Sequence, residues 1–169
     1  MDLLITISLI LIAGFIFVLF AKQKQHKRYN RSDYYDNQKQ RVEVGGYKKQ
    51  ALLNQTEQVA YKAITTAVSD KNLRVFAQVS LGEILTHSHK KLYLDIMSKR
   101  VDFLLTDQNF IPIMVIEIHG SGHYSKNAEH RDNIKKIALT SADVDYLAIA
   151  TSGTQIYQDV YQALIQRIS

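Results

Sequence analysis

The chain of 169 residues contains no cysteine. This absence excludes a disulfide framework and any zinc site built on thiolates, and it fits a reducing compartment. Three familiar motifs are missing as well: G-x-x-x-x-G-K-[ST], G-x-G-x-x-G and G-x-S-x-G. The sequence therefore gives no support to a P-loop, to a dinucleotide-binding turn, or to the nucleophile turn of a serine hydrolase.

Ionisable side chains are absent from residues 3–21. Such a run approaches the ~20 residues that a helix rising ~1.5 Å per residue needs to cross a membrane. A cleaved signal peptide is the alternative, but it would have basic residues before a shorter apolar core. Here only Met1 and Asp2 precede the run, and basic residues follow it. We therefore predict a transmembrane anchor over residues 1–21 of a single-pass membrane protein, with the following domain in the cytoplasm.

The excess positive charge lies next to this apolar run. Residues 22–50 hold nine Lys or Arg and three Asp or Glu, whereas residues 51–169 hold twelve of each sign. Membrane orientation and attraction of residues 22–31 to anionic lipid are sufficient to explain the excess. The net charge of +5 therefore does not by itself indicate a nucleic-acid partner. Low hydrophobicity without a clear period predicts that residues 22–50 form a flexible or loosely helical linker.

Residues 51–169 are numerous enough for one domain with its own core. Apolar residues recur at helical spacing in segments 54–67, 128–142 and 155–168. Strand-like runs occupy residues 73–81, 101–105, 111–118 and 146–150. Residues 81–98 are ambiguous and are expected to form a loop with helical pieces. The order predicts an α/β sandwich with a mixed sheet covered by helices on both sides.

Polar residues interrupt two of the apolar strands. Asp102 lies early in one strand, and Glu117 and His119 lie two apart in the next, so the latter two project from the same face. A hairpin between the strands could bring Asp102 close to Glu117. Carboxylates buried together raise each other's pKa, and a divalent cation between them removes that cost. Such a cation can also activate a bound water and neutralise a phosphate under attack.

These segments resemble a known pattern. The runs R-V-D-F-L-L, I-M-V-I-E-I-H-G-S-G-H and R-D-N-I-K-K are similar to the PD-(D/E)XK nuclease-like superfamily. In that superfamily an Asp and a hairpin precede Glu-x-Lys on a strand. The order V-D-F … I-E-x-x-G-x-x-H … R-D resembles the very-short-patch-repair endonuclease-like branch, and most closely the bacterial domain of unknown function 2726 family. The resemblance covers roughly residues 50–152 and implies a three-layer restriction-endonuclease-like sandwich.

The resemblance also implies a metal site. Asp102 and Glu117 would hold Mg²⁺ or Mn²⁺, with the backbone carbonyl of Ile118 as a further ligand. Glu57 matches the acidic residue of the first helix, which is a ligand or contacts the metal through water. His119 stands where the superfamily has its lysine. A histidine there can accept a proton near neutral pH but supplies positive charge only when it is protonated.

Three further residues complete the implied site. His123 matches a histidine of the repair-endonuclease-like branch, where it could act on the leaving group or bind phosphate. Arg131 and Lys135 lie four apart on the helix expected over residues 128–142 and could meet a phosphate.

The carboxylates have structural alternatives. Asp102 could form an ion pair with Arg100 or Arg131, and Glu57 could be only a helix-capping residue. Glu117 is harder to explain as a structural residue, because unpaired buried carboxylates are rare.

The remaining residues have ordinary explanations too. His119 and His123 could be polar residues of a glycine-containing turn, and the charged helix face that carries Arg131 could simply be solvated. His87 and His89 form an H-x-H pair, but no third ligand is spaced to complete a zinc site.

The sequence thus predicts a membrane-anchored, cytoplasm-facing nuclease-like domain that hydrolyses phosphodiester bonds in DNA or RNA with metal-activated water. The alternative is a binding module of the same fold without catalysis, which recruits nucleic acid or a protein to the membrane. The missing lysine at position 119 and the neutral residues 51–169 motivate this alternative, since nucleic-acid affinity comes largely from phosphate neutralisation. A plain membrane scaffold would leave Glu117 unexplained.

Overall fold

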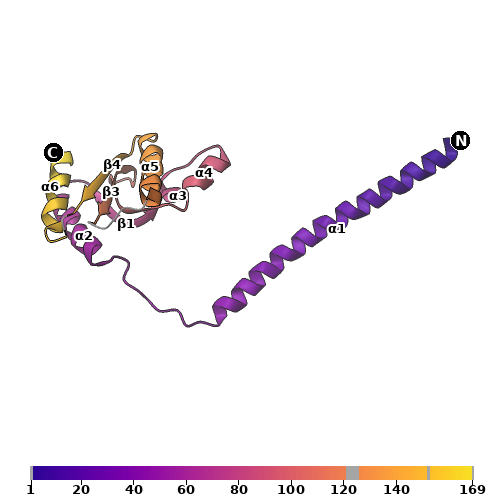
Figure 1. Cartoon of the computed structure of the whole chain (residues 1–169), viewed down its shortest axis with the longest axis horizontal. Coiled ribbons are helices and arrows are strands. Elements are labelled where there is room, and N and C mark those ends of the chain that lie inside the picture. The colour runs from indigo at the N-terminus through magenta and orange to yellow at the C-terminus, as the bar shows by residue number, and fades with distance from the viewer. Residues whose placement is uncertain (1, 121–125, 152, 169) are drawn as a thin grey trace. The chain divides into compact units, whose positions relative to one another are not determined.

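The computed structural model describes residues 2–120, 126–151 and 153–168. It divides into two compact units, Met1–Lys49 and Gln50–Ser169. The first unit consists of one long helix, α1 (Asp2–Glu43), and an irregular segment after it (Figure 1). Most of the predicted linker is therefore helical, and only its end is irregular.

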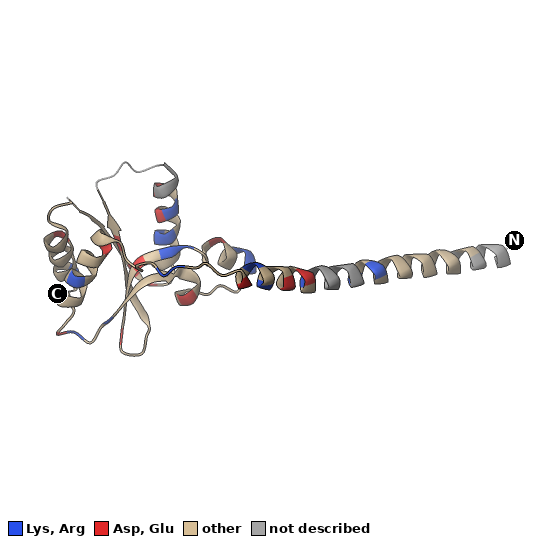
Figure 2. Ribbon diagram, turned by 90° about the horizontal axis from the view of Figure 1, so that it is seen from below, with Lys and Arg blue, Asp and Glu red and all other residues tan. Residues whose placement is uncertain are grey.

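The predicted transmembrane anchor is wrong. Within the described residues, no helix combines the length and the apolarity that crossing a membrane requires. The apolar run does not form a separate helix of membrane length. It is the first half of α1, which continues through charged and polar residues to Glu43 (Figure 2). The anchor in the predicted fold class and the single-pass, cytoplasm-facing localisation are corrected accordingly. The lipid contact expected of residues 22–31 stays a prediction.

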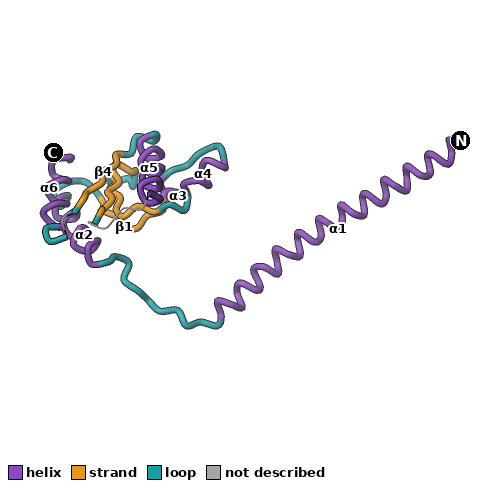
Figure 3. The backbone as a smooth tube through the Cα atoms, in the orientation of Figure 1, coloured by secondary structure: helices purple, strands orange, loops and turns teal. Residues whose placement is uncertain are grey.

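The second unit contains both helices and strands (Figure 3). Its elements in chain order are α2 (Gln55–Ala67), β1 (Arg74–Ser80), α3 (Leu81–Ile84), α4 (Lys90–Ile96), β2 (Arg100–Thr106), β3 (Pro112–His119), α5 (Lys126–Thr140), β4 (Asp145–Ala150) and α6 (Ile156–Ile168). The predicted order of the main elements is confirmed. The ambiguous residues 81–98 contain the two short helices α3 and α4.

The four strands form one sheet in the order β1-β2-β3-β4. The first two pairings are antiparallel, and β3 pairs with β4 in parallel. Helix α5 provides the crossover that a parallel pair needs. The predicted mixed sheet is therefore confirmed, and the two strands of the crossover end side by side at His119 and Ala150.

Helices cover both faces of the sheet (Figure 1). On one face, α2 and α6 enclose what we call the α2–α6 core, which includes Ala60, Ala63, Ile64, Phe103, Leu105, Ile116, Val160 and Leu164. On the other face, α5 and α3 enclose the α5 core, which consists of Leu81, Val101, Leu104, Val115, Leu139 and Val144. The sheet is the middle of three layers.

Replacing Ile64 with alanine should destabilise the protein by about 2–5 kcal/mol, because its fully buried side chain fills the α2–α6 core. Ile137→Ala removes the same atoms from α5 at a position that is 61% exposed, so its effect should stay within about 0.5 kcal/mol. Urea unfolding followed by tyrosine fluorescence compares the two variants, since the chain has ten tyrosines and no tryptophan. Equal losses would contradict this assignment of the core.

Candidate metal and nuclease-like site

Strand β2 changes face at the candidate aspartate. Phe103 packs in the α2–α6 core, and Leu104 packs in the α5 core. Strict alternation would put Val101 on the side of Phe103, yet Val101 packs in the α5 core with Leu104. Asp102 therefore stands where the alternation of β2 breaks.

In strand β1 the alternation of side chains between the two faces breaks at the position opposite Asp102. Ala77 packs toward the α2–α6 core, and Val79, two residues later, packs toward the α5 core. Between them, Gln78 has a φ of 58°, which is uncommon for a residue other than glycine. The pairing register is the same before and after Gln78, which sets this residue opposite Asp102. The two strands are thus distorted together where the site begins.

The distortion lets the Asp102 side chain reach the next strand. Its Oδ2 accepts a hydrogen bond from the backbone N–H of Ile118 at 2.8 Å. The regular pairing of β2 with β3 extends only as far as Phe103 and Ile116, so the carboxylate substitutes for a strand carbonyl beyond that point. Within the described residues, Asp102 is bound by a backbone N–H and forms no ion pair with Arg100 or Arg131.

Glu117 points from β3 toward α5, where it meets Lys135. The Glu117 side chain is 5% exposed, and its Oε1 lies 2.5 Å from the Lys135 Nζ. The same ammonium lies 2.9 Å from Asp132 Oδ1 and 3.4 Å from the backbone oxygen of Arg100. Lys135 is therefore a buried cation held by three oxygens from β2, β3 and α5.

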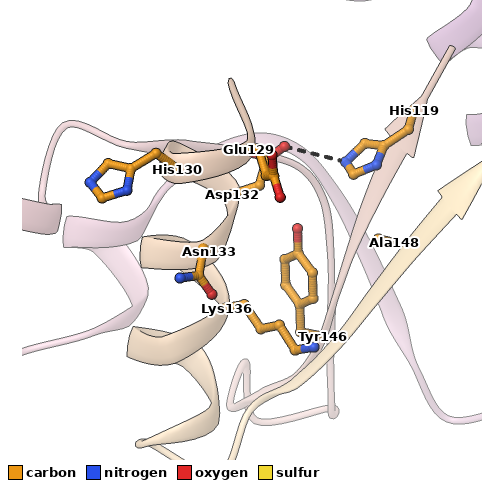
Figure 4. A pocket seen from close by; sticks show the side chains of 8 residues that line it. All are labelled: His119, Glu129, His130, Asp132, Asn133, Lys136, Tyr146 and Ala148. Atoms are coloured by element: carbon orange, nitrogen blue, oxygen red, sulfur yellow. Dashed lines mark ion pairs between the residues drawn. The ribbon is translucent and has the colours of Figure 1, made fainter. Parts of the chain in front are cut away.

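Asp132 connects this ion pair to His119. Its Oδ2 lies 3.5 Å from His119 Nε2 (Figure 4). Its Oδ1 contacts Lys135. Glu117, His119 and Asp132 each offer one ligand atom, and these atoms all lie within 4.8 Å of one another. We call Glu117, His119, Asp132 and Lys135 the Lys135 cluster.

Negative charge exceeds positive charge around Glu117. Burial is the largest influence and raises the pKa of Glu117 from 4.5 to about 7; the hydrogen bond from Lys135 opposes this, and repulsion from Asp102 and Asp132 adds to it. Burial alone would lower the pKa of Lys135, but its hydrogen bonds to Glu117 and Asp132 outweigh burial and raise it. The ammonium stays charged, and one ammonium does not fully compensate the carboxylates around it.

An open groove of about 710 Å³ begins at the cluster and runs between α5 and β4 (Figure 4). Its lining residues are His119, Glu129, His130, Asp132, Asn133, Lys136, Tyr146 and Ala148. The volume lies within the ~300–1,000 Å³ that is usual for ligand sites. His119 and Asp132 belong both to the cluster and to the groove, so a molecule in the groove would contact them directly.

The structure separates some of the other predicted site residues from this cluster. The Glu57 carboxylate accepts the N–H of Asn54 at 2.8 Å and completes a capping box at the start of α2. Arg131 is exposed on α5, whereas Lys135 is buried among carboxylates, so the two predicted phosphate ligands differ in environment. His123 lies outside the described residues.

The H-x-H pair makes a local contact. The backbone N–H of His89 donates to His87 Nδ1 at 2.9 Å, which is a turn interaction between neighbours. This contact is consistent with an ordinary loop.

The sequence interpretation missed Asp132 as a member of the site. In the run R-D-N-I-K-K, the sequence pointed only to Arg131 and Lys135, as possible phosphate ligands or as part of a solvated helix face. Asp132, Lys135 and Leu139 recur at helical spacing, and Leu139 is fully buried. Two charged residues on the face that carries a buried leucine were the available signal.

The family model "Protein of unknown function (DUF2726)" matches residues 49–168. The chain belongs to this family. An uncharacterized protein of Haemophilus influenzae is 38% identical to it over 120 residues, which are 70% of this chain and 61% of the relative. The uncharacterized protein y4bI of Sinorhizobium fredii is 39% identical over 107 residues, which are 62% of this chain and 78% of that relative.

The matched region thus spans about three fifths of the Haemophilus relative. No solved structure matches the chain. The predicted family membership is confirmed, and the wider PD-(D/E)XK likeness stays a prediction.

Lys135→Met should destabilise the DUF2726 domain by roughly 3–5 kcal/mol at pH 8, because it leaves Glu117 buried without its cation. The loss should be smaller at pH 5.5, where Glu117, whose pKa the substitution raises further, takes up a proton and becomes neutral. Urea unfolding at both pH values measures the difference.

The wild-type protein should also become less stable as the pH rises, but by a smaller amount than Lys135→Met. A pKa raised from 4.5 to about 7 means that the contribution of Glu117 to stability is fully present below pH 4.5 and is lost as the pH rises through 7. The double variant Glu117→Gln, Lys135→Met is the control and should recover much of the loss at pH 8. A pH-independent loss in Lys135→Met would contradict the burial of an ionised pair.

Proposed function

We propose that the DUF2726 domain of this chain is a metal-dependent nuclease-like hydrolase that cleaves phosphodiester bonds in DNA or RNA. The observation that carries the proposal is the gathering of Glu117, His119 and Asp132 around Lys135 at one end of an open groove. Asp102 adds a further carboxylate beside β3. The resemblance of the sequence to PD-(D/E)XK nucleases supports the same chemistry.

The donor set fits a divalent cation. Carboxylate oxygens and an imidazole nitrogen are both metal ligands, and the carboxylates exceed the single ammonium among them. Glu117, His119 and Asp132 would hold the ion, with Asp102 close by. When bound, it would supply a water of lowered pKa and neutralise charge on the phosphate.

The chain's own residues have separate tasks in this proposal. His119 Nε2 and Asp132 Oδ2, which lie 3.5 Å apart, would both ligate the ion and so position its bound water beside the groove. Lys135 supplies the positive charge that the superfamily pattern has at position 119, but from α5 rather than from the strand. Lys136 lines the groove and could meet a substrate phosphate there.

Asp102→Asn and Glu117→Gln should abolish cleavage by the purified full chain in Mn²⁺ or Mg²⁺, because each removes a negative charge beside the proposed metal. His119→Ala should slow cleavage by at least about tenfold, because it removes a ligand of the proposed ion. Gel assays on single-stranded DNA, duplex DNA and RNA measure the rates.

Asp95→Asn is the matched control, because Asp95 is an exposed carboxylate on α4, and cleavage by this variant should be unchanged. The proposal fails if the full chain cleaves none of these substrates with either metal, or if Asp102→Asn keeps full activity.

A second candidate function is nucleic-acid binding without catalysis. The observation that favours it is that the Lys135 ammonium already joins Glu117 and Asp132, so these carboxylates have a partner without any metal. In this case the groove and the exposed cations of α5 would hold the nucleic-acid backbone.

Under this second candidate, Arg131→Ala and Lys136→Ala should each weaken binding and reduce its salt dependence by about one phosphate contact. Fluorescence anisotropy with labelled DNA and RNA over a salt series makes the measurement. Lys62→Ala, an exposed lysine on α2, is the matched control and should leave binding unchanged. Retained affinity in both α5 variants would argue against the groove as the binding surface.

A further inference from the structure

We infer that Glu117, His119 and Asp132 form a site for a transition-metal ion rather than for Mg²⁺. The inference deepens the proposed function and rests on it for the use of the metal, but its test does not depend on cleavage. The family resemblance implied a different ligand set, namely Asp102, Glu117, the Ile118 carbonyl and Glu57. The two sets share Glu117, and Asp132 is absent from the earlier one.

The positions of the ligand atoms support this site. A metal with bonds of ~2.0–2.2 Å in tetrahedral geometry holds its ligand atoms roughly 3.3 Å apart. His119 Nε2 and Asp132 Oδ2 are 3.5 Å apart, and all three ligand atoms lie within 4.8 Å of one another. The His119–Asp132 separation is already close to this value, and Glu117 must approach the other two ligand atoms by up to about 1.5 Å.

Strand β3 and helix α5, which carry these ligands, limit the movement of their side chains. Glu117 and His119 project from the same face of β3, and β3 is paired with β4 through both residues. Asp132 comes from α5, which the buried Lys135–Glu117 pair joins to β3. The site is therefore built on a strand and a helix rather than on a loop.

Charge favours a divalent ion in addition to Lys135. Lys135 contacts one oxygen of Glu117 and one oxygen of Asp132, and the second oxygen of Asp132 faces His119. The carboxylates of Asp102, Glu117 and Asp132 outnumber the ammonium by two. A divalent cation makes this group neutral while Lys135 keeps its present contacts.

The imidazole determines the class of metal. Mg²⁺ prefers octahedral oxygen ligands and retains most of its water, so a histidine nitrogen adds little to its affinity for a site. Imidazole suits ions such as Zn²⁺, and carboxylates with one imidazole are also acceptable to Mn²⁺. Three protein ligands leave a coordination position for water, and the groove beside His119 and Asp132 provides access to it.

The test is isothermal titration of the metal-free full chain with Zn²⁺, Mn²⁺ and Mg²⁺ at pH 7.5. We expect one equivalent of Zn²⁺ or Mn²⁺ to bind, Zn²⁺ more tightly than Mn²⁺, and Mg²⁺ at least ~100-fold more weakly than Zn²⁺. His119→Ala and Asp132→Asn should each weaken Zn²⁺ binding at least tenfold, and His119→Ala should leave Mg²⁺ binding unchanged.

A spectroscopic measurement identifies the histidine. Bound Mn²⁺ should show electron spin echo modulation from an imidazole nitrogen, and this signal should be lost in His119→Ala. His87→Ala is the matched control: it removes an exposed histidine of the H-x-H turn and should change neither the affinity nor the spectrum.

Three results would overturn the inference: no metal binding by the full chain, equal affinity for Zn²⁺ and Mg²⁺, or unchanged Zn²⁺ binding in His119→Ala. Zn²⁺ binding through His119 without cleavage of any substrate would support this site and remove the proposed nuclease function. If cleavage depends on Mg²⁺ and His119→Ala binds Zn²⁺ as tightly as the wild type, the nuclease function stands and this site is ruled out.

Discussion

The buried pair of Glu117 and Lys135 is the interaction on which the arrangement of the site depends. A carboxylate on the covered face of β3 needs a cation, and α5 supplies it from the turn that packs over the strand. Because Asp132 lies three residues before Lys135, the same contact brings Asp132 beside His119. Pairs of this kind add little net stability, but breaking one is expensive. The pair therefore fixes the orientation of α5 about its axis. This orientation determines which side chains of α5 line the groove.

Hydrophobic periodicity was sufficient to predict most of the fold. The order of helices and strands from residue 54 onward and the mixed sheet follow from patterns that record burial directly, as in the apolar runs of β2 and β3. The anchor prediction rested on the apolar run of residues 3–21 and on the charges on either side of it. The structure continues the same helix through the charged residues up to Glu43, and no described helix meets the requirements of a membrane span.

The site was only partly predictable, for physical reasons. The shared face of Glu117 and His119 follows from the two-residue period of a strand. The contribution of Asp132 and Lys135 depends on the approach of α5 to β3, a tertiary contact that local patterns do not contain. The hydrogen bond from Ile118 to Asp102 depends on a backbone distortion shared by two strands. Glu57 fitted two explanations at the sequence level, and its capping contact with Asn54 is the one that the structure contains.

The left-handed backbone of Gln78 has a consequence beyond the aspartate opposite it. β1 is an edge strand, so one side of it presents backbone groups to which a strand of another molecule could add. A residue with a φ of 58° turns its peptide groups out of line and interrupts that row in the middle of β1. The distortion that lets Asp102 reach β3 thereby also interrupts the edge to which a strand of another molecule could add.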